Sequence, residues 1–383
     1  MSDINEIFVR RRAGRLEVAL VADARLVELR LADADTIPQG AIAIGRVETP
    51  AADGSAVFVD IGAEKAGFLR LIDMIGGPAD RPQPGDPVLV QLVRAAADDG
   101  KGPRLTMKLA LPGRFVVLRP QESGVVVSER IEDDGVRGRL ASALGDLAAE
   151  AGLTVRTAAA EIDAEILRAE VLRLAMAWDR IRARALTALP PSVLSTPDDA
   201  LAEAVRETGH RLQRAVVDEA RLQRDVETLR TLYGDRFAVE LMAGDPPAFD
   251  MHDLDAQIDQ ALAKEVALPG GGSIAIETTR ALTAIDVDSG TARNALAVNL
   301  EAAEVIAQQL RLRNIGGAVL IDFITLRQAA DRDRVLGRLA MLLAGDPTPS
   351  QVVGWTRLGL VEMTRARRGP TLAAALAAGA EEA

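Results

Sequence analysis

The stretch ALTAIDVDSG at residues 281–290 alternates apolar and polar side chains and ends in two aspartates, Asp286 and Asp288. Successive side chains of a β-strand point to opposite faces, so a strand here places both carboxylates on one face. The almost wholly apolar run AVLIDF at residues 318–323 predicts a second strand, which contains Asp322. Open α/β sheets bind ligands at the carboxyl ends of their strands, where these aspartates lie.

The region around these strands has the pattern of an α/β layer with mixed strands. The glycine-rich turn at residues 269–272 precedes an alternating strand at 273–277, which predicts a strand, turn, strand unit. Two helices and a final strand are expected further on, at residues 295–313, 329–343 and 351–356. The Ala-rich tail at 372–383 is expected to be frayed or weakly helical.

Earlier in the chain, alternation across residues 7–31 predicts a β-hairpin. Short apolar runs separated by glycine and proline follow, and together they favour a small OB-type barrel. Its five strands are expected at residues 41–48, 57–61, 67–71, 87–93 and 104–106. Two helical patterns follow. The first covers residues 158–188 and is terminated by the proline pair Pro190 and Pro191, and the second covers the charge-rich residues 198–232.

The composition is that of a globular protein with two or three cores, since 48% of the 383 residues are hydrophobic and 26% are charged. The chain contains no cysteine, which excludes thiolate zinc sites, and its two histidines, His210 and His252, leave little for imidazole ligation. Any catalytic metal must therefore be bound by oxygen.

The N-terminal sequence lacks a basic region followed by an apolar one, and no apolar run reaches about 18 residues. A cytoplasmic protein without a membrane partner is expected. The net charge of -11 argues against indiscriminate binding to nucleic acid, so any contacts to a nucleic acid would have to be local. Solvated helix faces and strand ends are the alternative for each candidate arginine cluster. These clusters are Arg10, Arg11, Arg12 and Arg15; Arg311 and Arg313; and Arg365, Arg367 and Arg368.

The three aspartates suit a hard cation. Mg2+ or Mn2+ bound by one to three carboxylates can activate a water for in-line attack on a phosphodiester. In the structural alternative, Asp286 and Asp288 start a turn and Asp322 caps a strand. Spacing alone leaves both interpretations open.

The stretch from Leu268 to Pro370 resembles the catalytic region of the ribonuclease E/G family. The matching blocks are LPxGGSI at 268–274, ALTAIDV at 281–287, NLEAA at 299–303, QLRLR at 309–313, IGG at 315–317, IDFI at 321–324 and RLGLVEMTR at 357–365. The front of the chain also matches, through EVALV at 17–21 and FVDIGAEKAGFL at 58–69, so the resemblance covers nearly the whole chain.

The resemblance implies that Asp286 and Asp322 are the two magnesium ligands of the family. Asp288 stands where the family usually has an asparagine that assists at the scissile phosphate. Its added charge makes it either a third ligand or a group that repels the phosphate. The loop between Gly290 and Asn299 is also several residues shorter than the usual family loop.

Phe58, Phe68 and Lys101 match RNA-contacting positions of the family's OB-type domain. Aromatic rings stack on bases and a lysine attracts phosphates, which suits this role. For the two phenylalanines the alternative is a place in the barrel core.

Gly113, Val117, Arg156 and Thr157 match the family's pocket for a 5′-monophosphate. Arg156 can bind phosphate in bidentate fashion, and the Thr157 hydroxyl can donate one more hydrogen bond. The alternative for Arg156 is a buried structural arginine.

The resemblance further implies an α+β multidomain fold. A ribonuclease H-like scaffold would carry an inserted OB-type barrel and a 5′-sensor region, and a DNase I-like α/β catalytic domain would follow. The expected boundaries are 1–37 and 205–264 for the scaffold, 38–108 for the barrel, 109–204 for the 5′-sensor region and 265–383 for the catalytic domain with its Ala-rich tail.

The implied activity is that of a metal-dependent endoribonuclease that hydrolyses single-stranded RNA to 5′-phosphate and 3′-hydroxyl ends in RNA processing or decay. The expected cofactor is Mg2+, with Mn2+ as a substitute and no zinc. The cysteine pair through which family members share zinc between protomers is missing, so a monomer or weak homodimer is expected and no zinc-linked tetramer. Two alternatives stay open: an RNA-binding protein on the same scaffold with impaired catalysis, and a nuclease that acts on DNA.

Overall fold

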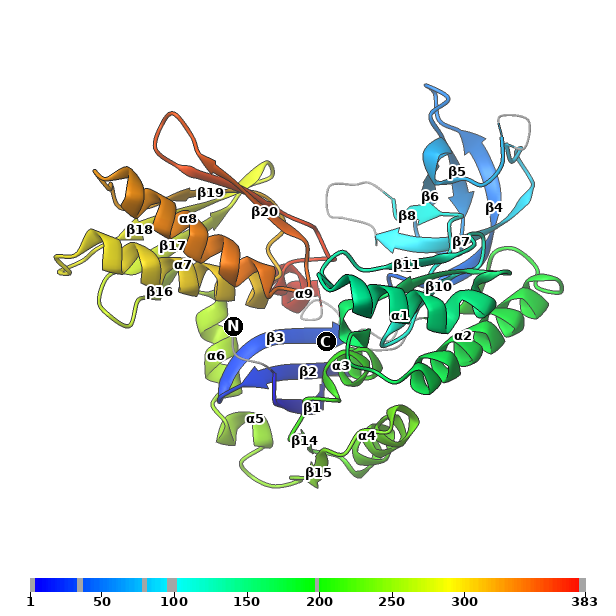
Figure 1. Cartoon of the computed structure of the whole chain (residues 1–383), viewed down its shortest axis with the longest axis horizontal. Coiled ribbons are helices and arrows are strands. Elements are labelled where there is room, and N and C mark those ends of the chain that lie inside the picture. Colours follow the sequence, from blue (N-terminus) through cyan, green and yellow to red (C-terminus); the bar gives the residue numbers. More distant parts are fainter. Residues whose placement is uncertain (1–3, 33–36, 78–80, 95–101, 197–199, 379–383) are drawn as a thin grey trace. The chain divides into compact units, whose positions relative to one another are not determined.

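The computed structural model describes residues 4–32, 37–77, 81–94, 102–196 and 200–378, and the statements below concern these residues. Two compact units make up the chain (Figure 1). Unit 1 consists of Met1–Ala34 and Ala200–Ala383, and unit 2 consists of Asp35–Asp199. Unit 2 is therefore inserted into the sequence of unit 1.

Unit 1 contains a five-stranded sheet, here called the N-terminal sheet. Its strands are β1 (Glu6–Arg12), β2 (Arg15–Ala22), β3 (Arg25–Ala32), β14 (Arg214–Val217) and β15 (Ala238–Leu241), in the order β15-β14-β1-β2-β3. β1 to β3 form an antiparallel meander, and β14 runs parallel to both β1 and β15. The hairpin predicted across 7–31 is thus one strand short. Two tight turns, at Ala13 and Gly14 and at Asp23 and Ala24, all with positive φ, join three strands.

The charged run at 198–232, predicted to be helical, also contains a strand. Helices α3 (Ala200–Thr208) and α4 (Ala220–Tyr233) flank β14, whose residues 215–217 are fully buried. Four residues are too few to show a period in the sequence. Pairing with the strands on either side decides their conformation instead.

Helices cover both faces of the N-terminal sheet. One face packs against α3 and α4 through a cluster that includes Leu201 and Leu222. The other face packs against α5 (Ala248–Met251) and α6 (Leu254–Leu262), with Phe249 among the buried residues. The sheet is therefore the middle layer of this part of unit 1.

The Ala-rich tail forms α9 (Leu372–Ala378). Leu372 is buried in the cluster that contains Phe249, and Arg15 of β2 donates a hydrogen bond to the carbonyl of Ala375 at 2.7 Å. The described part of the tail is thus a helix anchored on unit 1, more ordered than the sequence predicts.

The remainder of unit 1 is built on a six-stranded sheet, here called the C-terminal sheet. Its strands are β16 (Glu265–Ala267), β17 (Ser273–Thr278), β18 (Leu282–Asp288), β19 (Gly317–Asp322), β20 (Ser350–Trp355) and β21 (Val361–Arg365), in the order β16-β17-β18-β19-β21-β20. Only β18 and β19 pair in parallel. The sequence prediction ends at 351–356 and misses β21, whose alternation is short and largely polar.

Two helices, α7 (Ala295–Leu312) and α8 (Ala329–Ala344), cover one face of the C-terminal sheet (Figure 1). Ile285, Val319 and Ile321 point into the core beneath these helices. Alternate residues of β18 and β19 are exposed on the opposite face, which no helix of this cluster covers. The sheet thus has one apolar and one solvent-facing side.

Unit 2 begins with a closed five-stranded barrel. The strands are β4 (Ile42–Pro50), β5 (Ala56–Asp60), β6 (Gly67–Arg70), β7 (Pro87–Arg94) and β8 (Arg104–Thr106), and closure comes from the pairing of β4 with β7. Val59, Leu69 and Leu105 fill the interior. The five predicted strands are confirmed, and the barrel is consistent with an OB-type fold.

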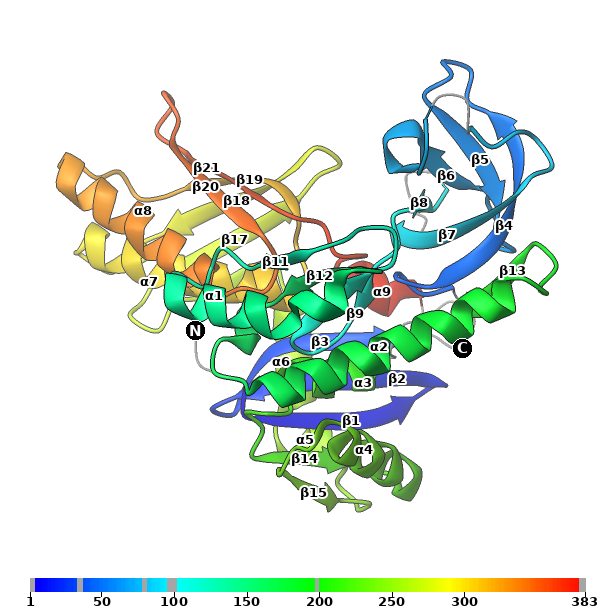
Figure 2. The ribbon, with the colours of Figure 1, turned by 45° about the vertical axis from the view of Figure 1, so that its right-hand side comes forward.

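A smaller sheet and two long helices complete unit 2. The strands are β9 (Leu111–Pro112), β10 (Val116–Arg119), β11 (Val125–Val127) and β12 (Gly152–Val155); the helices are α1 (Asp134–Leu144) and α2 (Ala164–Ala185), and β13 (Ser192–Ser195) joins the barrel at β4. Short 3-10 helices occur at Leu71–Asp73, Gly145–Ala148 and Thr157–Ala159. Figure 2 shows α1 and α2 side by side against this sheet.

Among the described residues, no helix has both the length and the apolar character that a bilayer crossing requires.

Glu28 of β3 links the N-terminal sheet to α7 within unit 1. Its carboxylate accepts hydrogen bonds from Arg30 at 2.7 Å and from Arg311 at 3.0 and 3.1 Å. Burial alone raises the pKa of Glu28, but the charges of Arg30 and Arg311 outweigh burial and lower this pKa to about 2. The ionised carboxylate therefore stabilises the folded state.

We expect Glu28→Gln to lower the free energy of unfolding of unit 1 by about 3 kcal/mol at pH 7, because Arg30 and Arg311 lose their shared carboxylate. A depressed carboxyl pKa stabilises the fold above its ordinary value of 4.5, and this contribution is lost as the pH falls toward 2. The difference between wild type and variant should therefore fall below half by pH 3. Urea unfolding in a Trp178→Phe background, where Trp355 reports on unit 1, measures it.

Glu277→Gln is the matched control, because Glu277 pairs with Lys264 at 3.8 Å and both side chains are largely exposed. Its effect should stay below about 0.5 kcal/mol. Equal effects of the two substitutions at pH 7 would show that Glu28 does not link the two parts of the unit.

Candidate active site

Asp286 and Asp322 lie opposite each other on the parallel strands β18 and β19. Both side chains are exposed, whereas Ile285, Val287 and Ile321 beside them are buried in the core. Neighbouring strands lie about 4.8 Å apart, so the two carboxylates stand side by side on the open face of the sheet. The structure brings this predicted pair together.

Asp288 lies two residues further along β18, on the same face as Asp286. It pairs with Ser273 of β17, whereas β19 ends level with Asp286. Its carboxylate accepts a hydrogen bond from the Gly290 N–H at 2.7 Å, which closes a local turn. Asp288 therefore lies at the flank of the aspartate pair, with part of its carboxylate engaged.

The chemistry of the pair fits a hard cation. Mg2+ is usually held by one or two carboxylates and keeps several of its waters, so Asp286 and Asp322 supply enough protein ligands. Within the described ranges, no group of three or more His, Cys, Asp or Glu side chains could hold a metal ion. The site therefore suits an open, partly hydrated ion and does not form a closed cage.

A close backbone contact fixes the end of β18. Gly272 has a φ of +93°, and a Cβ at this position would come within 2.3 Å of the Asp288 carbonyl oxygen. Both the positive φ and the close approach require glycine. The glycine-rich turn at 269–272 thus positions the strand that carries Asp286.

Asn299 holds the segment that follows Asp322. Its side chain is fully buried on α7, where it donates to the Ile324 carbonyl at 2.8 Å and accepts from the Ile324 N–H at 3.0 Å. The sequence analysis did not assign Asn299 a role. The available signal was an amide among the apolar positions of the helix predicted at 295–313.

Phe58 of β5 and Phe68 of β6 are cross-strand neighbours on the barrel. Their ring centroids lie 5.6 Å apart at an interplanar angle of 59°. Both residues are partly exposed and lie outside the core cluster, which contains their neighbours Val57, Val59 and Leu69 instead. The two rings are therefore accessible at the barrel surface. Residue Lys101, predicted to join them, lies outside the described residues.

Gly113, Val117, Arg156 and Thr157 come together in unit 2. Val117 is on β10, which pairs with β12, and Arg156 and Thr157 directly follow β12. The Arg156 guanidinium donates to the Gly113 carbonyl at 3.0 Å, and the Thr157 hydroxyl lies 3.1 Å from that of Ser128. Arg156 is partly buried and Thr157 is exposed, so the group reaches solvent.

Glu170 of α2 organises the turn at Gly113. Its buried carboxylate accepts hydrogen bonds from the backbone N–H groups of residues 114–116, at 2.7, 2.7 and 2.9 Å. A Cβ at Gly113 would approach this carboxyl group to 2.6 Å. The sequence analysis missed Glu170, although an acidic residue on the apolar face of the helix predicted at 158–188 was a visible signal.

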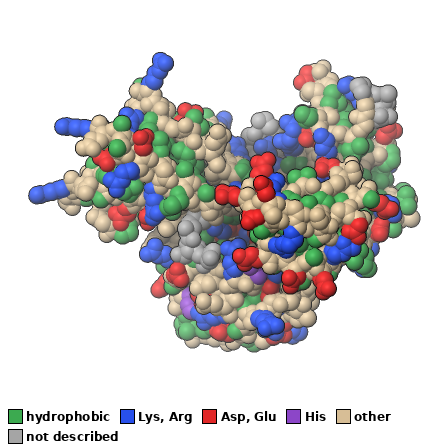
Figure 3. All heavy atoms as spheres, viewed as in Figure 1, with side chains coloured by type: hydrophobic (Ala, Val, Ile, Leu, Met, Phe, Trp, Pro, Cys, Tyr) green, Lys and Arg blue, Asp and Glu red, His purple; other side chains and the backbone are tan. Residues whose placement is uncertain are grey.

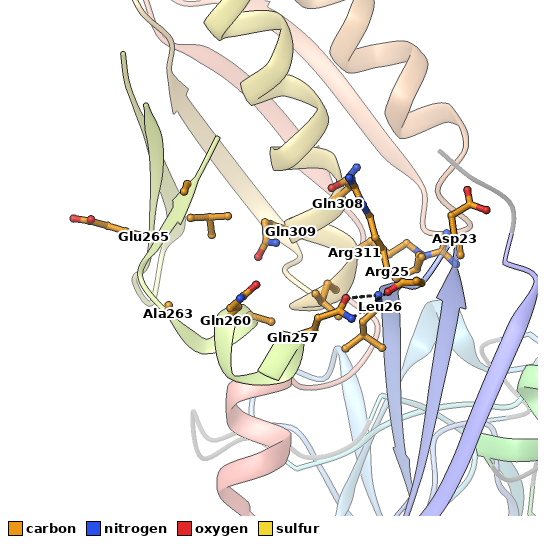
Figure 4. Close-up of a pocket in the computed structure, with 17 residues that line it drawn as sticks. Asp23, Arg25, Leu26, Gln257, Gln260, Ala263, Glu265, Gln308, Gln309 and Arg311 are labelled. Carbon is orange, nitrogen blue, oxygen red and sulfur yellow. Dashed lines mark hydrogen bonds between the residues drawn. The ribbon is translucent and has the colours of Figure 1, made fainter. Parts of the chain in front are cut away.

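A separate hollow of about 1010 Å³ lies in unit 1 between the β2–β3 turn, α6, β16 and the end of α7. Figure 4 shows amide side chains around it, among them Gln257, Gln260 and Gln309. Gln257 accepts from the Leu26 N–H and Gln309 from Arg313, each at 2.7 Å, so these two amides hold protein segments in place. None of the predicted metal, RNA and 5′-phosphate residues that the structure describes lines this hollow.

The carboxylate strands and the Gly113 group both fall within the match to a family model described as Ribonuclease E/G family, which spans residues 110–368. The chain belongs to the ribonuclease E/G family. The resemblance read from the sequence is thereby confirmed.

Individual members of the ribonuclease E/G family are similar over most of this chain. Ribonuclease E of Nostoc sp. is 37% identical over 358 residues, which cover 87% of this chain and 52% of the relative. Ribonuclease E of Synechocystis sp. is 34% identical over 356 residues, covering 87% and 53%. Ribonuclease G of Escherichia coli (strain K12) is 32% identical over 363 residues, covering 86% and 72%. The chain thus spans about half the length of these ribonuclease E relatives.

Replacing Phe58 or Phe68 by alanine should weaken binding of a single-stranded RNA oligonucleotide by about 1–3 kcal/mol for each lost stack. The reason is that a partly exposed ring offers a face to a base. Fluorescence anisotropy in EDTA measures affinity without cleavage. Val126→Ala is the control, because Val126 is an apolar side chain of unit 2 that is 62% exposed.

Thermal unfolding of the same variants separates binding from packing. Melting temperatures should stay close to wild type. A collapse in melting with unchanged affinity per folded molecule would place the two rings in the structure of the barrel and not in RNA binding.

Proposed function

We propose that this chain is a metal-dependent endoribonuclease that hydrolyses single-stranded RNA in RNA processing or decay, leaving 5′-phosphate and 3′-hydroxyl ends. The observation that carries the proposal is the exposed pair Asp286 and Asp322, opposite each other on parallel strands in a member of a ribonuclease family. The names of the relatives, ribonuclease E and ribonuclease G, support RNA as the substrate.

Asp286 and Asp322 would hold Mg2+, or Mn2+ in its place. When bound, such an ion activates a water and offsets the charge that develops on the phosphodiester. The two aspartates fix its position because buried Ile285 and Ile321 allow the carboxylates only one direction, away from the core. Asp288, at the flank, would be either a third ligand of the ion or a charge that repels the phosphate.

Residues of unit 2 would hold the RNA strand. Phe58 and Phe68 would stack on bases, with Lys101 near a phosphate. The group formed by Gly113, Val117, Arg156 and Thr157 would bind a 5′-monophosphate, and Glu170 would maintain the shape of that group. The accessible rings and the contact between Arg156 and Gly113 support these roles.

We assign the parts of the chain to four domains. The proposed boundaries are 1–37 and 205–264 for a ribonuclease H-like scaffold around the N-terminal sheet, 38–108 for the OB-type barrel, 109–204 for the 5′-sensor region, and 265–383 for a DNase I-like domain around the C-terminal sheet. The strand order of each sheet and the closure of the barrel support this assignment.

Two other functions predict different outcomes in one assay. Labelled single-stranded RNA and DNA are incubated with the protein in Mg2+ or in EDTA. The endoribonuclease cleaves only RNA and only in Mg2+. An RNA-binding protein with impaired catalysis retards RNA without cleaving it, and a DNA nuclease cleaves the DNA strand.

Asp286→Asn and Asp322→Asn should each lower Mg2+-dependent cleavage by about 100-fold or more, because each removes a charged metal ligand and keeps the side-chain size. RNA affinity in EDTA and thermal unfolding should stay near wild type, since both side chains are exposed. Wild-type cleavage rates in either variant would contradict the two-aspartate site.

Asp288→Asn separates the two roles left open for Asp288. A flanking role predicts a mild change or a gain in activity, because the substitution removes a negative charge beside the phosphate. A loss as deep as that of Asp322→Asn would make Asp288 a metal ligand.

Arg156→Ala should reduce the preference for 5′-monophosphorylated over 5′-hydroxyl RNA while leaving cleavage of the 5′-hydroxyl substrate nearly unchanged. The guanidinium is the main charge available to a phosphate in this group. Matched oligonucleotides that differ only at the 5′ end give the ratio of kcat/KM. A ratio that the substitution does not change would assign Arg156 a structural role.

A further inference from the structure

Three loops begin at the end of the C-terminal sheet where the strands β18 and β19 reach Asp286 and Asp322. They follow β18, follow β19, and connect β20 to β21. Each loop carries one exposed arginine: Arg293, Arg327 and Arg357. Figure 3 shows basic side chains standing out from this part of unit 1. Three loops at the strand ends that carry the aspartate pair thus each contain one exposed cation.

Within the described part of the chain, none of these three arginines has an ion pair or a hydrogen-bond partner. Three buried or partly buried arginines of the same layer are paired with carboxylates: Arg311 with Glu28, Arg338 with Glu304, and Arg365 with Asp346. The chain has 56 acidic and 45 basic residues, so acidic partners are plentiful. Unpaired arginines gathered at one edge therefore point to an anion from outside the chain.

The turn that carries Arg357 is held in place. The Thr356 N–H donates to the Leu360 carbonyl at 2.7 Å, and the Gly359 N–H donates to the Thr356 carbonyl at 3.1 Å. Trp355, at its base, lies 6.0 Å from the Phe323 ring between centroids. A turn closed in this way presents its outer side chains at a fixed position.

The register places this turn beside the aspartate pair. Val361 of β21 lies opposite Ile321 of β19, so the turn begins at the level of Asp322 on the adjacent strand. Leu358, at the tip, is 87% exposed although it is apolar. A base that packs on Leu358 would bring its phosphates close to Arg357.

We propose that Arg293, Arg327 and Arg357 form a cationic rim that binds the phosphates of single-stranded RNA next to the scissile one, with Leu358 in contact with a base. This inference rests on the proposed endoribonuclease function. The rim explains how an acidic protein brings a polyanion to two aspartates: the attraction is confined to the edge where the chemistry takes place.

The test compares two variants that lose the same charge. In the rim variant Arg293, Arg327 and Arg357 are replaced by Gln. In the control variant Arg221, Arg224 and Arg280 are replaced by Gln. These arginines are also exposed in unit 1 and form no ion pair with any residue that the structure describes, and Arg280 lies at the opposite end of β18 from Asp286.

Affinity for a 5′-hydroxyl RNA oligonucleotide is measured by anisotropy in EDTA at several salt concentrations. Each phosphate contact to a single strand contributes about 0.7 to the slope of log K against log salt, so the rim variant should lose about 2 from that slope. At low salt the affinity of the rim variant should fall about tenfold or more. The control variant should keep most of the wild-type affinity and most of the wild-type slope. Leu358→Ala should weaken binding without changing the slope, and Met341→Ala, another exposed apolar residue, should not.

Cleavage in Mg2+ distinguishes failure of the rim from failure of the proposed function. The rim variant should raise KM with kcat largely kept, because none of its residues is assigned to the aspartate pair. Equal slopes for rim and control variants, with active wild-type enzyme, would overturn the rim. Wild-type protein that binds RNA and never cleaves it would overturn the proposed function, and the slopes would still test the rim.

Discussion

The parallel pairing of β18 with β19 is the constraint on which the candidate active site depends. Ile285 and Ile321 pair with each other one residue before the aspartates, and both are buried. A slip of one residue in this register would turn one of the isoleucines to solvent and Asp322 into the core, which is costly for a charged group. The register that fills the core is therefore also the one that sets the two carboxylates side by side.

Helices α7 and α8 cover only one face of the C-terminal sheet, so its two faces carry different kinds of side chain. The face under α7 and α8 carries the apolar core, and the open face carries Asp286, Asp288 and Asp322. Two contacts fix the ends of the strands that carry these aspartates. Gly272 packs against the end of β18, and Asn299 of α7 holds the segment that follows β19 through hydrogen bonds to Ile324. The geometry of the candidate site thus rests also on residues outside the aspartate pair.

Much of this architecture could be predicted from the sequence, because alternation in β17, β18 and the barrel strands is a local property. β14 and β21 could not. The four residues of β14 become a strand through pairing with distant segments, and β21 is a short, largely polar run that pairs with β19 as well as with the adjacent β20. The aspartates were visible as a pattern, but pattern alone did not separate a metal site from a turn. Family resemblance favours the metal site, which remains a proposal. Glu170 was missed because its role is defined by three backbone N–H groups far away in the sequence.

The insertion of unit 2 into unit 1 has a consequence for how the chain is made. Glu6 of β1 pairs with Arg214 of β14, so the N-terminal sheet cannot be finished until all of unit 2 has been synthesised. Unit 2 is continuous and can fold on emergence from the ribosome, whereas β1 to β3 wait for a distant partner and bear the loop-closure entropy of a non-local contact. The first sheet to be started is therefore completed only after both sheets of unit 2 have been synthesised.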